Sequence, residues 1–276
     1  MKSSSYRAPW WLPGGNLQTI YAASIANAGP VPRYERERWG TPDGDFIDID
    51  WLERRLDRPL VVVFHGLEGN SSSHYAVALS NAFLDAGWRV AIPHFRGCSG
   101  EMNRLPRAYH SGDSTEIDWI LQRFREIVGG ALSVVGVSLG GNALLKHLGE
   151  SGQAAAKSIK SAVSVSAPLD LMTAGETLGR GFARLYSRMF FKKLKVKAEQ
   201  KARQFPDVIN VSAMRAANSL RDFDNVVTAP LHGFKDTNDY WTRASSKPVL
   251  GAIRVPTLDR KSTRLNSSHG YISYAV

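Results

Sequence analysis

The segment ALSVVGVSLGGNALLKHLGE, residues 131–150, decides the fold because it joins a predicted strand to a predicted helix through a single tight turn. Residues 132–137 form a short, valine-rich apolar run, which is typical of a buried strand. The residues after the turn place apolar side chains at helical spacing. Residues 136–140, GVSLG, fit the pattern G-x-S-x-G at the junction. Between a strand and a helix, this pattern predicts a strained turn that presents the serine hydroxyl to a pocket.

The serine of this turn, Ser138, is the predicted nucleophile. Gly136 and Gly140 fit that prediction, because a Cβ at either position would collide with adjacent backbone. The helix that follows directs free N–H groups and the positive end of its dipole at the same point, so the Leu139 backbone N–H is one expected oxyanion donor. The alternative is that these glycines and Gly141 only permit close packing of helix on strand, as in a dinucleotide site. The G-x-G-x-x-G fingerprint of such a site is absent.

A second oxyanion donor is expected from the loop after an earlier strand. The apolar run at residues 60–64, LVVVF, predicts that strand, and it leads directly into HGLEG at residues 65–69. The candidate donor in this loop is the Leu67 backbone N–H.

The rest of the chain repeats the rhythm of strand and helix. Short β-branched apolar runs alternate with longer amphipathic runs, which predicts an α/β fold with a mostly parallel sheet and flanking helices. A Pro-Asp-Gly turn at residues 42–44 predicts a hairpin at the leading edge of the sheet. A helix is predicted to begin after Asp113, with Glu116 three residues on, and to end at Gly129. Residues from roughly 171 to 250 are helical and basic in pattern, so we expect an inserted helical cap there.

The composition favours one large soluble domain or a domain with an inserted subdomain. The chain has 276 residues with 43% hydrophobic content, and no apolar run resembles a signal peptide or a membrane span. A cytoplasmic location is the expectation. The single cysteine, Cys98, excludes an internal disulfide and suits a reducing compartment.

The net charge of +10 is concentrated in one segment. Residues 180–203 carry nine Lys or Arg against one Glu, and apolar side chains recur there at helical spacing: Phe182, Leu185, Tyr186, Met189 and Phe190. Three interpretations of this helix stay open: a lid over an acyl pocket, an interfacial helix on anionic lipid, or a solvated basic face. The lid is favoured, and it is compatible with peripheral membrane contact. Nucleic acid is not expected, because no nucleic-acid module or aromatic-lined basic groove accompanies the charge.

Several stretches together resemble the YheT-type branch of the α/β-hydrolase superfamily, from about Pro9 to Leu258. The resemblance rests on PWWLPGGNLQTI, HGLEGNSSSHY, PHFRGCSGEMNRLPRAYHSGD, GVSLGGNALLKHLGE and VTAPLHGFKDTNDYW. It implies a serine hydrolase of carboxylic esters, with Ser138 as nucleophile and the Leu67 and Leu139 amides as the oxyanion hole. It implies no metal and no organic cofactor.

Hydrolysis of this kind also needs a histidine base and a carboxylate, in the chain order Ser, Asp, His. In the resembled family VPTL continues as a strand and a loop that bears the aspartate, and the histidine follows in a Gly-rich loop. Asp259 would instead lie inside the strand, and His269 follows it too closely, so we expect neither to serve. Asp170 is a weak candidate for the acid, although a helix cap is the commoner fate of such a residue.

Two further histidines are given structural interpretations. His65 is expected to hydrogen-bond the backbone of its own loop, and His147 is expected at the surface of the helix after the turn.

The last residues, 259–276, are polar and lack a periodic face. We expect them to be a non-native tail, which leaves residues 1–258 as the hydrolase domain without its last strand and closing helix.

The sequence therefore predicts a serine esterase of the carboxylesterase or acylglycerol lipase type, acting on a small-molecule ester or a lipid. Its activity is expected to be impaired in this chain, because the triad Asp and His are not identified. The alternative is a non-catalytic hydrolase-fold protein that binds lipid or serves as a scaffold.

Overall fold

The computed structural model describes residues 28–178 and 183–260 continuously, together with the short pieces 9–13, 17–18, 21 and 25–26. Along these residues, no helix combines the length and the apolar character that crossing a membrane requires.

One central sheet organises the described part of the chain. Its seven strands lie in the order β1-β2-β4-β3-β5-β6-β7. Their bounds are β1 Glu35–Gly40, β2 Phe46–Leu52, β3 Leu60–Phe64, β4 Arg89–Pro93, β5 Leu132–Val137, β6 Ile159–Val165 and β7 Thr257–Arg260. Strand β2 pairs antiparallel with β1 and β4, and every other pairing is parallel. The predicted α/β fold with a mostly parallel sheet and a leading hairpin is confirmed.

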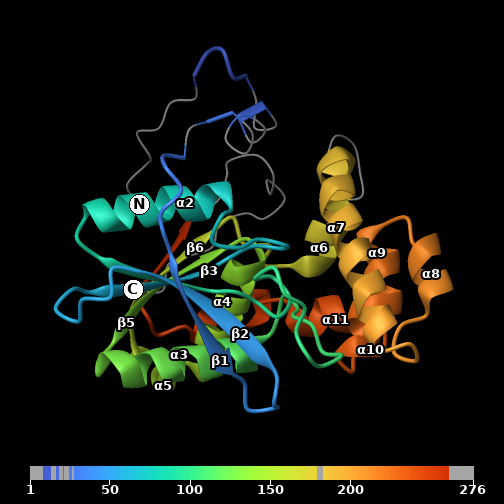
Figure 1. The fold of residues 1–276 in the computed structure, drawn as a ribbon. Helices are drawn as coiled ribbons and strands as arrows, with labels where there is room; N and C mark the ends of the chain where they lie inside the picture. Colours follow the sequence, from blue (N-terminus) through green and yellow to red (C-terminus); the bar gives the residue numbers. More distant parts are fainter. Residues whose placement is uncertain are drawn as a thin grey trace.

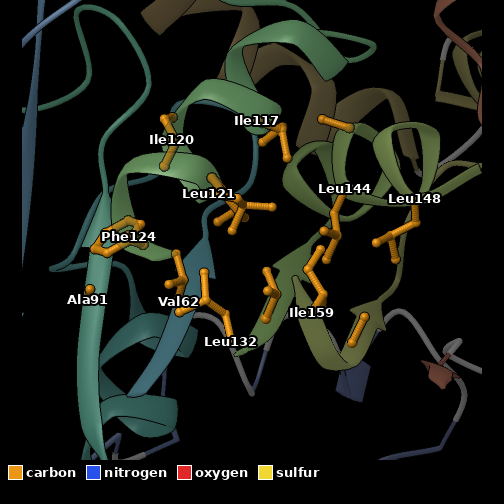
Figure 2. Packing of buried hydrophobic residues seen from close by; sticks show 14 of the residues in the cluster. Val62, Ala91, Ile117, Ile120, Leu121, Phe124, Leu132, Leu144, Leu148 and Ile159 are labelled. Carbon is orange, nitrogen blue, oxygen red and sulfur yellow. The ribbon is translucent and has the colours of Figure 1, made fainter. Parts of the chain in front are cut away.

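Helices cover both faces of this sheet (Figure 1). Helix α2, His74–Asp85, lies on one face, while α3, Ser114–Val128, and α4, Leu139–Ser151, pack on the other. The short helix α5, Gln153–Ala156, follows α4. Buried side chains from α3, α4 and the strands converge between these layers (Figure 2). Because successive residues of a strand point to opposite faces, Val62 joins this core while Val61 and Val63 pack toward α2.

Helix α3 has the ends that the sequence predicts. The Asp113 side chain accepts a hydrogen bond from the Glu116 N–H, and Gly129 ends the helix with a φ of 67°. Glu116 does not complete a capping box; its carboxylate instead accepts hydrogen bonds from Arg96.

The described chain between β6 and β7 consists of helices joined by short loops. Its elements are α6 Leu171–Leu178, α7 Ala183–Gln204, α8 Val211–Ala216, α9 Leu220–Phe223, the π-helix η1 Asp224–Thr228, α10 Ala229–Leu231, α11 Thr237–Ala244 and the 3-10 helix η2 Lys247–Ala252. Elements α6 to α10 gather at one side of the sheet (Figure 1). They have a small apolar core of their own, made by Ala198, Ala202, Ile209, Met214, Ala217, Phe223 and Val227.

The last element of this helical stretch, η2, returns to the sheet domain. A Cβ at Gly149 of α4 would meet the backbone and side chain of Val249 in η2, so the two elements are in close contact. The helical stretch of residues 171–250 therefore covers both the separate group of helices and a part that packs on α4.

Strand β7 extends two residues beyond Leu258. Asp259 pairs in register with Ser164 of β6, and the Arg260 carbonyl accepts a hydrogen bond from the Ser166 N–H at 2.7 Å. Asp259 thus lies inside a strand, where the sequence also placed it. Among the described residues β7 is an edge strand of the sheet. His269 and the rest of the predicted tail lie outside the described residues.

Candidate active site

Ser138 forms the turn between β5 and α4. Its φ of 53° and ψ of −117° lie in the left-handed half of backbone space, where residues other than glycine are uncommon. Its N–H donates to the Val165 carbonyl at 2.8 Å, and its own carbonyl accepts from the Asn142 N–H at 3.1 Å. The backbone on both sides therefore holds the serine in this conformation.

The flanking glycines have no room for a side chain. A Cβ at Gly136 would lie 2.6 Å from the Gly140 carbonyl oxygen, and a Cβ at Gly140 would lie 2.5 Å from the His65 carbonyl oxygen. Both obstacles are backbone atoms, which cannot move aside as a flexible side chain can. The sharpness of the turn depends on these two positions being glycine.

Two backbone N–H groups lie beside the serine. Leu139 is the first residue of α4, so its N–H has no acceptor within the helix. In the loop after β3, the N–H groups on either side of Leu67 are bound by tyrosines: Gly66 N–H donates to Tyr75 Oη at 2.7 Å, and Glu68 N–H donates to Tyr109 Oη at 2.9 Å. Leu67, Ser138 and Leu139 all line one cavity.

That cavity opens at the carboxyl ends of β3 and β5, where α/β sheets hold their ligands. Its walls are mainly apolar, and much of them comes from the helices that follow β6: Leu171, Ala174, Leu194, Phe223, Val227 and Leu231. Such a lining suits an acyl chain or another apolar group next to the serine.

Two histidines that the sequence analysis gave no role also line the cavity. His232 Nδ1 lies 2.7 Å from the Thr228 carbonyl and must donate to it, whereas His110 Nδ1 accepts from the Gly112 N–H at 3.2 Å. The two rings meet edge to face with centroids 4.8 Å apart. Burial lowers the pKa of His110 to about 4 and lowers that of His232 as well, so both rings are neutral at pH 7.

His65 lies in the loop after β3, which carries the predicted oxyanion donor, and it is fully buried. Its Nδ1 lies 2.8 Å from the Gly66 carbonyl, and its Nε2 accepts from the Phe95 N–H at 3.0 Å. The prediction that this ring binds its own loop is confirmed.

The prediction that His147 lies at the surface is wrong. It is buried in α4, 3.8 Å from Asp118 of α3 and near Ser151. The reason is that α3, the sheet and η2 all pack on α4, so this helix has little solvent-facing surface.

Asp170 has the role of a helix cap in the structure. Its Oδ1 accepts from the Thr173 N–H at the start of α6, and its Oδ2 lies 3.1 Å from Lys247 Nζ. No set of three or more His, Cys, Asp or Glu side chains among the described residues is placed to hold a metal ion.

Three polar groups near the cavity, of which Lys201 and Asp224 are buried and Lys197 is half-buried, were not anticipated. Lys197 and Lys201 of α7 turn inward, toward Glu68 and toward the Asn103 side chain respectively. Asp224 of η1 accepts from Thr228 Oγ1 at 2.6 Å and from Trp241 Nε1 at 2.8 Å, and burial raises its pKa to about 6. Of the apolar side chains predicted to share one face of this helix, only that of Phe190 is described, and it is 42% exposed; residues 183–189 are described by their backbone alone.

The single cysteine is not suited to act as a nucleophile. Cys98 is buried, and burial raises the pKa of its thiol to about 11, so the nucleophilic thiolate is scarce.

Comparison with known proteins agrees with this fold. The family model described as the alpha/beta hydrolase fold matches residues 59–266, so the chain belongs to the α/β-hydrolase family. Within it, the chain is 40% identical over 228 residues to the YheT protein of Escherichia coli (strain K12), which bears the name of an esterase; the match covers 80% of this chain and 66% of that protein. The predicted resemblance to YheT-type hydrolases is confirmed.

More distant relatives extend the comparison. Phospholipase ABHD3 of Mus musculus is 26% identical over 271 residues, covering 95% of this chain and 65% of the phospholipase. The chain thus spans about two thirds of the length of these curated relatives. Among solved structures, a thioesterase domain from the curacin biosynthetic pathway has a TM-score of 0.51 at 16% identity, covering 85% of this chain and 86% of that domain, which supports the fold alone.

Proposed function

We propose that this chain is a serine hydrolase of carboxylic esters, of the carboxylesterase or acylglycerol lipase type, with Ser138 as its nucleophile. The observation that carries the proposal is a serine held at a φ of 53° on a strand-to-helix turn, beside two backbone N–H groups and an apolar cavity. The names of the relatives, an esterase and a phospholipase, support ester bonds as the target.

In this mechanism the Ser138 hydroxyl attacks the ester carbonyl. The carbonyl oxygen becomes negatively charged and accepts hydrogen bonds from the Leu67 and Leu139 N–H groups, and the N-terminal end of the α4 dipole adds to its stabilisation. A base takes the serine proton and returns it to the leaving alcohol, and water then releases the acyl group. We assign this base and its partner acid to none of the described residues. His110 accepts at Nδ1 and therefore carries its proton on Nε2, the described hydrogen bonds do not join His232 to Ser138, and Asp170 caps a helix.

We propose further that the helices between β6 and β7 act as a cap over an acyl site. Leu194, Ala198, Phe223 and Val227 belong to these helices and line the cavity that Ser138 lines. An acyl chain bound there would be shielded from water on the side opposite the sheet.

Helix α7 also supports a proposed peripheral contact with anionic membrane. Lys192 and Lys193 are exposed, and the nearby apolar side chains Phe190 and Val196 are 42% and 50% exposed. A basic surface with exposed apolar groups is what attraction to an anionic lipid surface requires.

Labelling with a fluorophosphonate tests the nucleophile directly. We expect the purified 276-residue chain to take up one adduct, detected by intact mass spectrometry, and Ser138→Ala to take up none. Ser166→Ala is the matched control, since Ser166 is an exposed serine at the end of β6 with the same φ of 53°. Labelling that persists in Ser138→Ala contradicts the proposal.

Hydrolysis of p-nitrophenyl esters adds a second readout. We expect slow turnover that Ser138→Ala reduces, because the base is not assigned to a described residue. A chain that binds lipid vesicles but neither reacts with the fluorophosphonate nor turns over ester would favour the non-catalytic alternative.

A further inference from the structure

The lysine at position 197 of α7 reaches the loop that carries the predicted oxyanion donor. Its Nζ lies 2.9 Å from Glu68 Oε2 and donates to Cys98 Sγ at 3.2 Å. Although burial favours the neutral amine, the adjacent Glu68 carboxylate helps to raise the pKa of Lys197 above its ordinary value. Lys197 is therefore a cation when it meets Glu68.

Glu68 is the residue after Leu67, and its side chain is only 2% exposed. The Glu68 carboxylate accepts a hydrogen bond from Tyr109 Oη at 2.7 Å. The Glu68 backbone N–H in turn donates to Tyr109 Oη at 2.9 Å. These two bonds close a ring that fixes the Glu68 backbone, which has an unusual φ of 54°. A buried carboxylate in this ring needs a positive partner, and Lys197 supplies one.

The Leu67 N–H belongs to the peptide unit between Gly66 and Leu67, whose carbonyl accepts from the Gly69 N–H at 3.0 Å. The next unit is anchored through the Glu68 N–H, and the unit before it through the Gly66 N–H, which donates to Tyr75 Oη. The direction of the Leu67 N–H follows from these anchors, because the dihedral angles on either side of it are fixed. An N–H that stabilises an oxyanion must be held in place before the reaction, since reorientation during the reaction would cost part of its benefit.

We propose that Lys197 is a positioning residue, through which the helix α7 holds the Tyr109–Glu68 ring and hence the Leu67 N–H in the oxyanion geometry. This inference rests on the proposed function of Ser138. It makes the cap a part of the catalytic arrangement and not only a cover, because a residue of α7 completes a loop of the sheet domain.

A simple tether is the competing interpretation of Lys197. The structure separates the two, because α7 has a second anchor one turn later: Lys201 Nζ donates to Asn103 Oδ1 at 2.8 Å and to the Leu105 carbonyl at 2.6 Å. Loss of Lys197 therefore leaves the helix attached while removing the partner of Glu68.

Hydrogen exchange tests the coupling without any catalysis. Amide exchange measured by mass spectrometry on the whole chain should become at least threefold faster in peptides that cover residues 64–70 in Lys197→Met. Lys193→Met is the matched control, since Lys193 is an exposed lysine one turn earlier on the same helix. Unchanged exchange of residues 64–70 in Lys197→Met overturns the coupling.

The kinetics of fluorophosphonate labelling test the catalytic consequence. Lys197→Met should lower the maximal labelling rate about tenfold to a hundredfold, somewhat less than the loss of a whole oxyanion donor, while the half-saturating concentration stays within about twofold. Lys197→Arg, which keeps the cation, should restore at least half of the rate, and Lys193→Met should label like the wild type. A loss that falls only on the half-saturating concentration is the signature of a structural tether and overturns the proposal.

A double variant controls for misfolding. Lys197→Met with Glu68→Gln removes the unpaired buried charge and keeps the oxygen that Tyr109 binds, so it should fold like the wild type yet label slowly. Full recovery of the rate in this variant contradicts a need for the ion pair. Absence of labelling in the wild-type chain overturns the proposed function itself, whereas wild-type labelling that Lys197→Met leaves unchanged overturns only the role of Lys197.

Discussion

The turn at Ser138 and the helices after β6 meet at one cavity, but they are held in place by different forces. At the turn, backbone lies directly against backbone, and Gly136 and Gly140 leave no space for one more carbon. In the helices, a small apolar core is supplemented by the buried polar groups Lys201 and Asp224 and by the half-buried Lys197.

This difference separates a rigid part of the site from an adjustable one. Close-packed backbone cannot shift gradually, because even a small displacement brings its atoms into collision. Ion pairs and hydrogen bonds between long side chains tolerate small movements and respond to pH. Ser138 is thus fixed by sterics, while the helices that line the same cavity are held by contacts that solution conditions can alter.

The largest expected effect comes from adding one carbon at the turn. Gly140→Ala should destabilise the chain by about 3 kcal/mol or more, because the new Cβ would lie 2.5 Å from the His65 carbonyl oxygen and 2.7 Å from that of Phe64. Urea unfolding measures this loss. Gly130→Ala is the control, since no atom lies within 4 Å of its added Cβ, and it should change stability by less than about 0.5 kcal/mol. Equal losses in the two variants would remove the steric half of the comparison.

An intermediate effect is expected from pH at Asp224. Burial raises its folded pKa to about 6, above the ordinary 3.8, so the folded chain binds the proton more tightly than the unfolded chain does. The stability that this group contributes is present at low pH and is lost as pH rises through about 6. From about pH 4.5 to about pH 7.5, the wild type should lose about 2 kcal/mol relative to Asp224→Asn, which cannot ionise.

The pH experiment has a control of opposite sign in α9, the helix that directly precedes η1. Asp222 is exposed, and the hydrogen bond from Ser219 lowers its pKa, so its contribution is lost as pH falls. Urea unfolding of wild type, Asp224→Asn and Asp222→Asn across this pH range gives the three curves. Parallel curves for wild type and Asp224→Asn would mean that Asp224 is not protonated in the folded chain.

The smallest expected effect concerns the outer surface of α7. Lys192→Gln should weaken binding to phosphatidylserine vesicles about fivefold, since one lysine near an anionic surface contributes about 1 kcal/mol. Co-sedimentation with vesicles measures the partition. Lys160→Gln removes an exposed lysine of β6, away from this helix, and should bind as the wild type does. Equal binding by all three proteins would exclude α7 as the lipid-facing surface.

The sheet domain was predictable because its signals are local. Three such signals are the run of valines in β3, the cap at Asp113 and the glycines around Ser138. Each depends on residues within a few positions of one another. Such patterns report directly on strand, helix and turn.

The polar anchors of the cavity were not predictable, because their partners lie far away in the chain. Lys197 pairs with Glu68 and Lys201 with Asn103, and neither pair leaves a trace in the local sequence. The basic run of α7 suggested a solvated or lipid-facing surface, yet two of its lysines face inward. The prediction that His147 lies at the surface was wrong for the same reason, since the elements that bury it come from distant parts of the chain.

The backbone at Ser138 also has an evolutionary meaning. A non-glycine residue at a φ of 53° costs roughly 1–2 kcal/mol relative to an ordinary conformation, and glycine would adopt the same angle without that cost. Selection for stability alone would therefore exchange this serine for glycine, by a substitution that relieves strain and leaves the turn intact. Under the proposed function the Ser138 hydroxyl offsets this cost through chemistry, so a lineage that had abandoned ester hydrolysis is expected to replace this serine with glycine.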